Sequence, residues 1–196
     1  MTKAEKTKQF IIEKAAPIFN EKGIAGTSID DVLKATKLAK GCLYNHFESK
    51  EALSHAAVDY LMQKICGKTQ ALVGTANTAK EKLFVVLDSY KTPLSPTVAG
   101  GCPVLNFAVE SDDGCPVIKD KIKTAIQNSI QLISGIIKEG KANKEFSKDF
   151  DADEFALKMF STLEGGMIVC RISNSNTPMK TLITSLKNEI ESYTVE

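Results

Sequence analysis

Cys42 and His46 stand four residues apart in the stretch KGCLYNHFESKEAL, so on a helix their side chains share one face. A thiol and an imidazole in that arrangement could form half of a zinc site, or a nucleophile activated by a base. A structural zinc site needs four ligands, however, and His55 is the only other histidine, with no second cysteine near it in the sequence. Nothing nearby supplies the orienting group or oxyanion donor of a nucleophile. We therefore expect no metal, no cofactor and no catalytic residue here.

The same stretch gathers side chains that contact nucleic acid. Lys40 and Lys50 flank it with positive charge, which neutralises phosphates. Tyr44 and His46 can donate hydrogen bonds to phosphate oxygens with little loss of rotamer freedom. Small residues at the start of the stretch allow a backbone to approach a DNA groove closely. The residue types therefore indicate a surface that reads DNA.

The segments before this stretch read as helices. Residues 4–22 follow an amphipathic helical pattern with Pro17 inside it, where we expect a local kink, and Gly23 should end the helix. A short helix is expected to begin at Thr27 or Ser28, because an Asp three residues later completes a capping box.

A second short helix follows after a turn, and in it Leu43 and Phe47, four residues apart, are expected to point inward. A long helix should run from Ser49 to about Val73, and helical periodicity dominates the remaining chain. We therefore expect an all-α fold of about nine helices, with an N-terminal three-helix helix-turn-helix head and a larger helical body.

The stretch TSIDDVLKATKLAKGCLYNHFESKEAL, with IIEKAAPIFNEKG before it, resembles the DNA-binding head of the TetR family of bacterial transcriptional regulators. That family has a capped TS-x-x-D-I helix, a turn, SKGTLYxHF and SKEAL, and the match covers residues 8–54. The resemblance implies a DNA-binding domain over residues 1–50 and an effector-binding and dimerisation domain over residues 51–196. By position, it assigns phosphate contacts to Tyr44, His46 and Lys50, capping and DNA-backbone contacts to Thr27 and Ser28, and base contacts to Lys40, Gly41, Cys42 and Asn45.

Two positions depart from the family pattern. Cys42 replaces the usual Thr, which weakens a hydrogen bond and adds a site that can be oxidised. Lys37 stands where the turn usually has Gly, so some strain is expected if its φ is positive.

The tetrapeptide GCPV occurs twice, at residues 101–104 and 114–117. In both copies a helix should begin at the proline, with the cysteine near its N-cap. The unpaired N–H groups there favour the nucleophilic thiolate, so Cys102 or Cys115 could sense oxidants or electrophiles. The alternative is that each cysteine is a small residue suited to tight packing. GGCPVLNFAVESDD also resembles the GCxxxNxAxE segment that opens the sixth helix, beside the ligand cavity, in one branch of the family.

Apolar residues around this segment are core residues or line an effector cavity, and periodicity alone does not separate the two. Few charges lie among them, so a small apolar or electrophilic effector is favoured over a sugar phosphate. The candidates for ligand binding or sensing are Cys102, Leu105, Phe107, Phe84, Phe155 and Met159.

The last two expected helices carry more apolar surface than one face of a body needs, and Gly165 and Gly166 permit close helix approach. A four-helix interface between two subunits would explain both features. The candidates for that interface are Leu163, Met167, Leu182 and Leu186.

Composition excludes several classes of protein. The chain has 196 residues, 43% of them hydrophobic, which is typical of a globular protein. Residues 1–50 hold nine lysines and six acidic residues, so a net charge of +1 hides a basic N-terminal region. No stretch suggests a secretory signal or a membrane span, and five cysteines without a C-x-x-C pair suggest a reducing cytoplasm.

These observations favour a homodimeric transcriptional regulator that binds a near-palindromic double-stranded operator, and the family resemblance implies that it is a repressor. An effector or thiol modification would release the DNA by favouring a state in which the two heads have the wrong separation. The alternative is a thiol-based redox or detoxifying enzyme that uses the GCPV cysteines, although no base is apparent near them. A module whose head binds protein is a third possibility.

Overall fold

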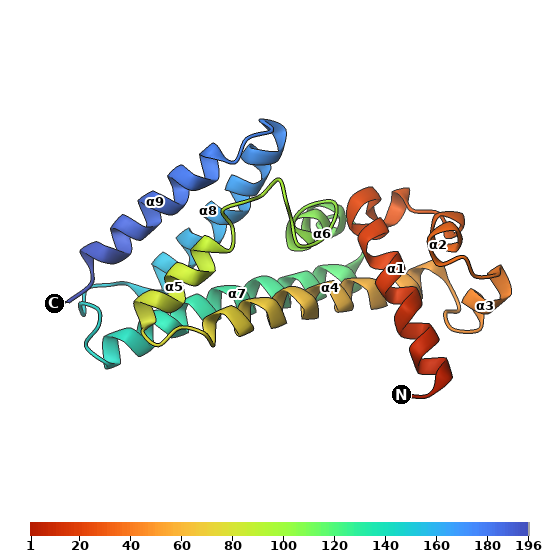
Figure 1. Cartoon of the computed structure of the whole chain (residues 1–196), viewed down its shortest axis with the longest axis horizontal. Helices are drawn as coiled ribbons and strands as arrows, with labels where there is room; N and C mark the ends of the chain where they lie inside the picture. The colour runs from red at the N-terminus through yellow and green to blue at the C-terminus, as the bar shows by residue number, and fades with distance from the viewer. Residues whose placement is uncertain (196) are drawn as a thin grey trace. The chain divides into compact units, whose positions relative to one another are not determined.

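The computed structural model describes residues 1–195, and these form nine α-helices with no strand beyond one isolated bridge between Phe146 and Thr194 (Figure 1). The expected all-α fold is therefore confirmed. Within the described residues, no helix is both long and apolar enough to cross a membrane. The helices are α1 (Lys3–Gly26), α2 (Ile29–Thr36), α3 (Lys40–Tyr44), α4 (Lys50–Val73), α5 (Ala79–Asp88), α6 (Pro103–Ser111), α7 (Pro116–Ala142), α8 (Ala152–Ile172) and α9 (Thr177–Ser192).

The helices form two compact units. The first unit comprises residues 1–65 and 96–125, and the second comprises residues 66–95 and 126–196. Helices α4 and α7 each contribute to both units. The functional boundary expected at residue 50 stays a prediction, since the compact units divide the chain at other positions.

Helix α1 is interrupted near its end rather than in its middle. The helix continues through Pro17, where a kink was expected, and the residue with non-helical backbone is Gly23, at φ 77° and ψ 163°. A positive φ of this size favours glycine. A Cβ atom at this position would also lie 3.1 Å from the Glu110 carboxylate. Gly23 therefore ends the regular part of α1, as its position in the sequence predicts.

The segment before α6 is fastened to α1 by buried amides. The Asn20 side chain is 3% exposed, and its Nδ2 donates to the carbonyl oxygens of Ala99 (2.6 Å) and Gly101 (3.1 Å). Asn106 Nδ2, on α6, donates to Asn20 Oδ1 (3.1 Å) and to the Gly100 carbonyl (3.1 Å). These bonds satisfy polar groups that burial would otherwise penalise, so they fix α6 against α1.

The turn between α2 and α3 contains the strained residue that the sequence suggested. Lys37 has φ 57° and ψ 26°, in the left-handed region, and its N–H donates to the Leu33 carbonyl at 2.8 Å. The condition under which strain was expected at this lysine is therefore met. The turn sets the direction in which α3 leaves α2.

The second unit is built on the contact between α8 and α9, which pack side by side (Figure 1). Gly166 permits this contact, because a Cβ atom there would lie 2.8 Å from Leu182 and 2.9 Å from Met179. Phe150 anchors an aromatic cluster at the other end, stacked on Tyr193 with ring centroids 4.4 Å apart. The close approach expected at the two glycines thus occurs at Gly166, within one chain.

Most residues expected at a dimer interface are buried within the subunit. Leu163, Met167 and Leu186 are at most 7% exposed, and Leu182 packs over Gly166. Their assignment to a subunit interface stays a prediction. The apolar side chains of α8 that do reach solvent are Leu157, Ile168, Val169 and Ile172, which are 47–85% exposed.

Replacing Lys37 with glycine should raise the free energy of unfolding by about 0.5–1 kcal/mol, because glycine adopts the left-handed backbone without a Cβ penalty. Chemical denaturation measures this change. Ala35→Gly is the matched control, since it places glycine inside exposed helix α2 and should lower the same free energy by about 1 kcal/mol. A loss of stability in both variants would contradict the strain assigned to Lys37.

Gly100→Ala should lower the free energy of unfolding by about 2–5 kcal/mol, through backbone strain and overpacking. Gly100 has φ +93°, and a Cβ atom there would lie 2.7 Å from the Asn20 carbonyl oxygen. Gly67→Ala is the control, because a Cβ on that helical glycine meets no atom within 4 Å. Similar denaturation midpoints for the two variants would be inconsistent with this close approach.

Candidate nucleic-acid interface

Helix α3 is too short to be stable alone, so two buried side chains hold it in place. Leu43 is fully buried and Phe47, just beyond the helix, is 4% exposed. Both were expected to point inward, and both do. With five residues, α3 depends on this packing for its orientation.

The remaining side chains of α3 form the exposed surface that the sequence predicted. Tyr44 is 42% exposed, and Lys40, Gly41 and Asn45 are exposed as well. Cys42 and His46 are half-buried. The Lys40 ammonium lies 6.0 Å from the centroid of the Tyr44 ring, so a cation and a phenol sit on one side of the helix. The structure therefore groups six predicted contact residues on α3 and the two residues that follow it, although their contacts to DNA stay predictions.

The start of α2 is a closed capping box. Asp31 N donates to Ser28 Oγ (3.2 Å), and Ser28 N donates to the Asp31 carboxylate (2.9 Å), as the sequence suggested. The Lys22 ammonium donates to the same carboxylate at 2.7 Å. Lys22 and the Ser28 hydroxyl hold the pKa of Asp31 well below its usual range. The carboxylate is therefore charged at neutral pH and keeps the helix start ordered.

Two residues assigned to DNA contacts have partners inside the head. Thr27 is 1% exposed, and its hydroxyl donates to the Gly23 carbonyl at 2.6 Å. Lys50 is half-buried, and its ammonium donates to the carbonyl oxygens of Ile24 (2.9 Å) and Thr27 (3.0 Å). Ser28, not Thr27, caps α2. In this structure Thr27 and Lys50 position the head, and any DNA contact by them stays a prediction.

Residues 24–27, between the break at Gly23 and the cap of α2, form a corner that is bound from two sides. The Glu110 carboxylate on α6 accepts hydrogen bonds from the backbone N–H groups of Ile24 (2.9 Å) and Ala25 (2.8 Å). Lys50, on α4, binds the corner's carbonyl oxygens. Acidic and basic side chains thus satisfy complementary backbone groups that the break leaves unpaired.

Sequence reasoning missed Glu110 and the paired asparagines Asn20 and Asn106. One signal could have identified two of them. Asn106 and Glu110 are four residues apart, so they share one face of α6, and both belong to the segment GGCPVLNFAVE. Their partners lie more than 80 positions away in the sequence, so periodicity alone did not assign a target.

The predicted effector residues divide between the two compact units. Cys102 stands at the N-cap of α6, as expected, and Phe107 on the same helix is fully buried. In the second unit Phe155 and Met159 are buried. Phe84 is half-buried, with the Lys187 ammonium 4.5 Å from its ring centroid. Their role in binding an effector stays a prediction, as does that of half-buried Leu105.

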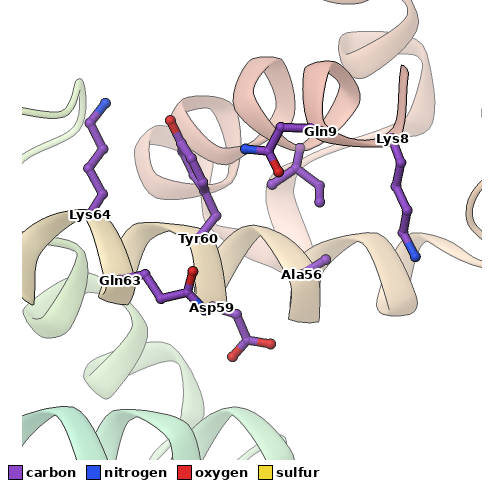
Figure 2. A pocket seen from close by; sticks show the side chains of 8 residues that line it. Lys8, Gln9, Ala56, Asp59, Tyr60, Gln63 and Lys64 are labelled. Atoms are coloured by element: carbon purple, nitrogen blue, oxygen red, sulfur yellow. The ribbon is translucent and has the colours of Figure 1, made fainter. Parts of the chain in front are cut away.

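An open groove between α1 and α4 lies in the first unit (Figure 2). Its lining mixes apolar surface with polar and charged side chains, among them Lys8, Gln9, Asp59, Tyr60 and Lys64, which Figure 2 labels. None of the predicted effector residues lines it. The groove therefore lies apart from the residues predicted to bind an effector.

The expectation that no base lies near the GCPV cysteines is wrong for Cys115. His55 Nε2 on α4 lies 3.7 Å from Cys115 Sγ, which directly precedes α7. The two residues are 60 positions apart, so sequence spacing gave no sign of the contact. A cysteine that is near neither histidine in the sequence thus lies beside His55 in the fold.

Comparison with known proteins agrees with this architecture. The family model for bacterial regulatory proteins of the tetR family matches residues 11–57, and the model for a tetracyclin repressor-like C-terminal domain matches residues 79–186. The chain is 41% identical over 171 residues to the biofilm operon icaADBC HTH-type negative transcriptional regulator IcaR of Staphylococcus aureus. That alignment covers 78% of this chain and 92% of IcaR.

Solved structures show the same fold over the whole chain. A TetR transcriptional regulator from Chloroflexus aurantiacus J-10-FL is 34% identical, with a TM-score of 0.94 over 99% of this chain and 98% of that one. A cysteine mutant of the TetR family regulator CifR, solved with 26-base-pair operator DNA, is 18% identical, with a TM-score of 0.77 over 94% and 95% of the two chains. At that identity CifR shows likeness of fold alone. The two matched domains and the identity to IcaR establish that this chain belongs to the TetR family of bacterial transcriptional regulators.

Proposed function

We propose that the protein is a homodimeric repressor that binds a near-palindromic operator in the cytoplasm and is released by a small apolar or electrophilic effector. The observation that carries this proposal is the construction of α3. Two buried anchors, Leu43 and Phe47, fix the helix, while Lys40, Tyr44 and Asn45 extend into solvent. An exposed set of cationic, phenolic and amide groups on a fixed helix suits a major groove.

The relatives support the same function. IcaR is a negative regulator of an operon, and CifR was solved on operator DNA. By analogy, each subunit of this protein sets α3 in a major groove, with the half-sites about 34–36 Å apart. The enzyme alternative loses support, since membership of a regulator family accounts for the head and the body together.

The exposed apolar face of α8 supports a dimer. Leu157, Ile168 and Ile172 lie on one side of the helix with the small residues Ser161 and Gly165 between them, because the spacings are three or four residues. A Cβ on Gly165 meets no atom within 4 Å in the chain itself. A second copy that covers this face would remove the large apolar side chains from water and could approach closely at the small residues.

The attachment of α6 to α1 suggests how an effector would release the operator DNA. Asn106 and Glu110 on α6 bind α1, and Cys102 stands at the N-cap position of the same helix. An effector that binds beside α6, or an electrophile that bonds to the Cys102 sulfur as the thiol loses its proton, would favour another position of α6. Such an effector shifts the equilibrium only if it binds the released state more tightly.

Capture of genomic fragments by the purified protein should recover a near-palindromic site, and less of it at higher salt, because phosphate contacts release counterions. Lys40→Ala should weaken operator binding by about 1–3 kcal/mol. Tyr44→Phe, which removes only a hydroxyl, should weaken binding to all sequences alike. Titration of labelled operator by fluorescence anisotropy at two salt concentrations measures both effects.

Lys148→Ala, at an exposed lysine of the second unit, is the control for lost charge and should bind as the unchanged protein does. If the reduced protein enriches no site, the repressor proposal fails. Binding that is indifferent to salt would instead indicate a head that binds protein.

Ile168→Asp should dissociate the dimer, because it would place a charge in an apolar interface. Light scattering coupled to size-exclusion chromatography, at several protein concentrations, measures the mass in solution. Val109→Asp is the matched control, since Val109 is 67% exposed on α6 and lies outside the α8 face. A dimer that persists in Ile168→Asp, or dissociates equally in both variants, would place the interface elsewhere.

A further inference from the structure

Glu51, His55 and Cys115 form a cluster of three potential metal ligands in the first unit. Glu51 and His55 are one turn apart on α4, so their side chains point to the same side of that helix. Cys115 meets them from the residue before α7. One ligand atom from each residue lies within 4.8 Å of the other two. Helix geometry and a contact between distant segments thus bring three ligand types together.

The separations fit a shared ion better than direct bonds. His55 Nε2 lies 3.9 Å from Glu51 Oε1, which is too long for a hydrogen bond. The same nitrogen is 3.7 Å from Cys115 Sγ. Ligand atoms in a tetrahedral zinc site lie about 3.4–3.6 Å apart, given zinc–ligand distances of about 2.0–2.3 Å. Small side-chain movements would therefore bring all three atoms to bonding distance of one ion.

The surroundings allow an ion to enter the cluster. The Glu51 side chain is 73% exposed and that of His55 is 23% exposed, so solvent reaches the cluster. Cys115 directly precedes the first turn of α7. Lys121, on the same helix, bonds to Asp59 at 2.6 Å. Its charge is therefore neutralised within the fold.

We propose that Glu51, His55 and Cys115 bind Zn²⁺, or a divalent transition-metal ion of similar preference, with water as the fourth ligand. A thiolate and an imidazole select such ions over Mg²⁺ and Ca²⁺, which prefer oxygen ligands alone. Three protein ligands and one open position give an exchangeable site rather than a closed structural one. The sequence analysis expected no metal because it considered only the residues near His55 in the sequence, and Cys115 is not among them.

A bound ion would join the first turns of α4 to the start of α7. Glu51 follows Lys50, whose ammonium holds the corner at residues 24–27. The ion would thereby restrict movement of α4 beneath the head, and operator affinity would respond to the metal. Only this regulatory consequence rests on the proposed function, because ion binding itself requires no operator.

The test is titration of the reduced, metal-free full-length protein with Co²⁺, followed by absorption spectroscopy. We expect one ion per chain, visible d–d bands of tetrahedral intensity and a near-ultraviolet thiolate-to-cobalt band that Zn²⁺ abolishes by displacement. Cys115→Ser should remove the thiolate band, and His55→Ala should weaken binding by at least about tenfold, as loss of a ligand requires.

The chain offers matched controls for both ligands. Cys66→Ser alters an exposed thiol outside the cluster, and His46→Ala alters the other histidine, so both should keep the spectrum of the unchanged protein. Circular dichroism verifies that each variant is folded, and Glu51→Gln, at an exposed position, should weaken binding without unfolding the chain.

Absence of a saturable thiolate band, or a band that persists in Cys115→Ser, would overturn the site. For the regulatory consequence, Zn²⁺ should change operator affinity in the unchanged protein but not in His55→Ala. If the protein gives the expected cobalt spectrum but Zn²⁺ does not change its operator affinity, only the regulatory consequence is overturned.

Discussion

The corner at residues 24–27 is the constraint on which the placement of the head depends. The regular part of α1 ends at Gly23, so the N–H and C=O groups of this segment need hydrogen-bond partners outside the helix. Glu110 accepts from the N–H groups and Lys50 donates to the carbonyl oxygens. Charged side chains from α6 and α4 thus bind the segment that leads into α2. The position of this segment sets the direction of α2 and, through the next turn, that of α3.

Two helices, α6 and α4, therefore contact the segment that leads to α2 and α3. Helix α6 carries Glu110 and Asn106 to α1, with Cys102 at its start. Helix α4 begins with Lys50, which binds the corner, and has Glu51 in its first turn and His55 in its second. A change at either helix would act on the same four residues. Under the proposed function, an effector, a thiol reagent or a metal ion would therefore act on operator binding through this corner.

The sequence predicted what local periodicity and turn chemistry determine. The inward positions of Leu43 and Phe47, the Ser28 cap and the positive φ of Lys37 each follow from residues within a few positions of one another. What the sequence left unassigned depends on long-range contacts. Glu110 is 86 positions from Ile24 in the sequence, and Cys115 is 60 positions from His55. Apolar patterning also identified α8 as rich in hydrophobic residues, but it did not show which face packs within the subunit.

If the corner at residues 24–27 sets the direction of α3, then Glu110 must affect operator binding although it lies on α6. The most direct measurement is the operator affinity of Glu110→Gln, with amide hydrogen exchange at Ile24 and Ala25 and Glu154→Gln as an exposed control. We predict faster exchange and at least about tenfold weaker binding, because hydrogen bonds to charged groups contribute about 1.5–3 kcal/mol. Unchanged affinity in a variant whose Ile24 and Ala25 amides exchange faster would contradict the account.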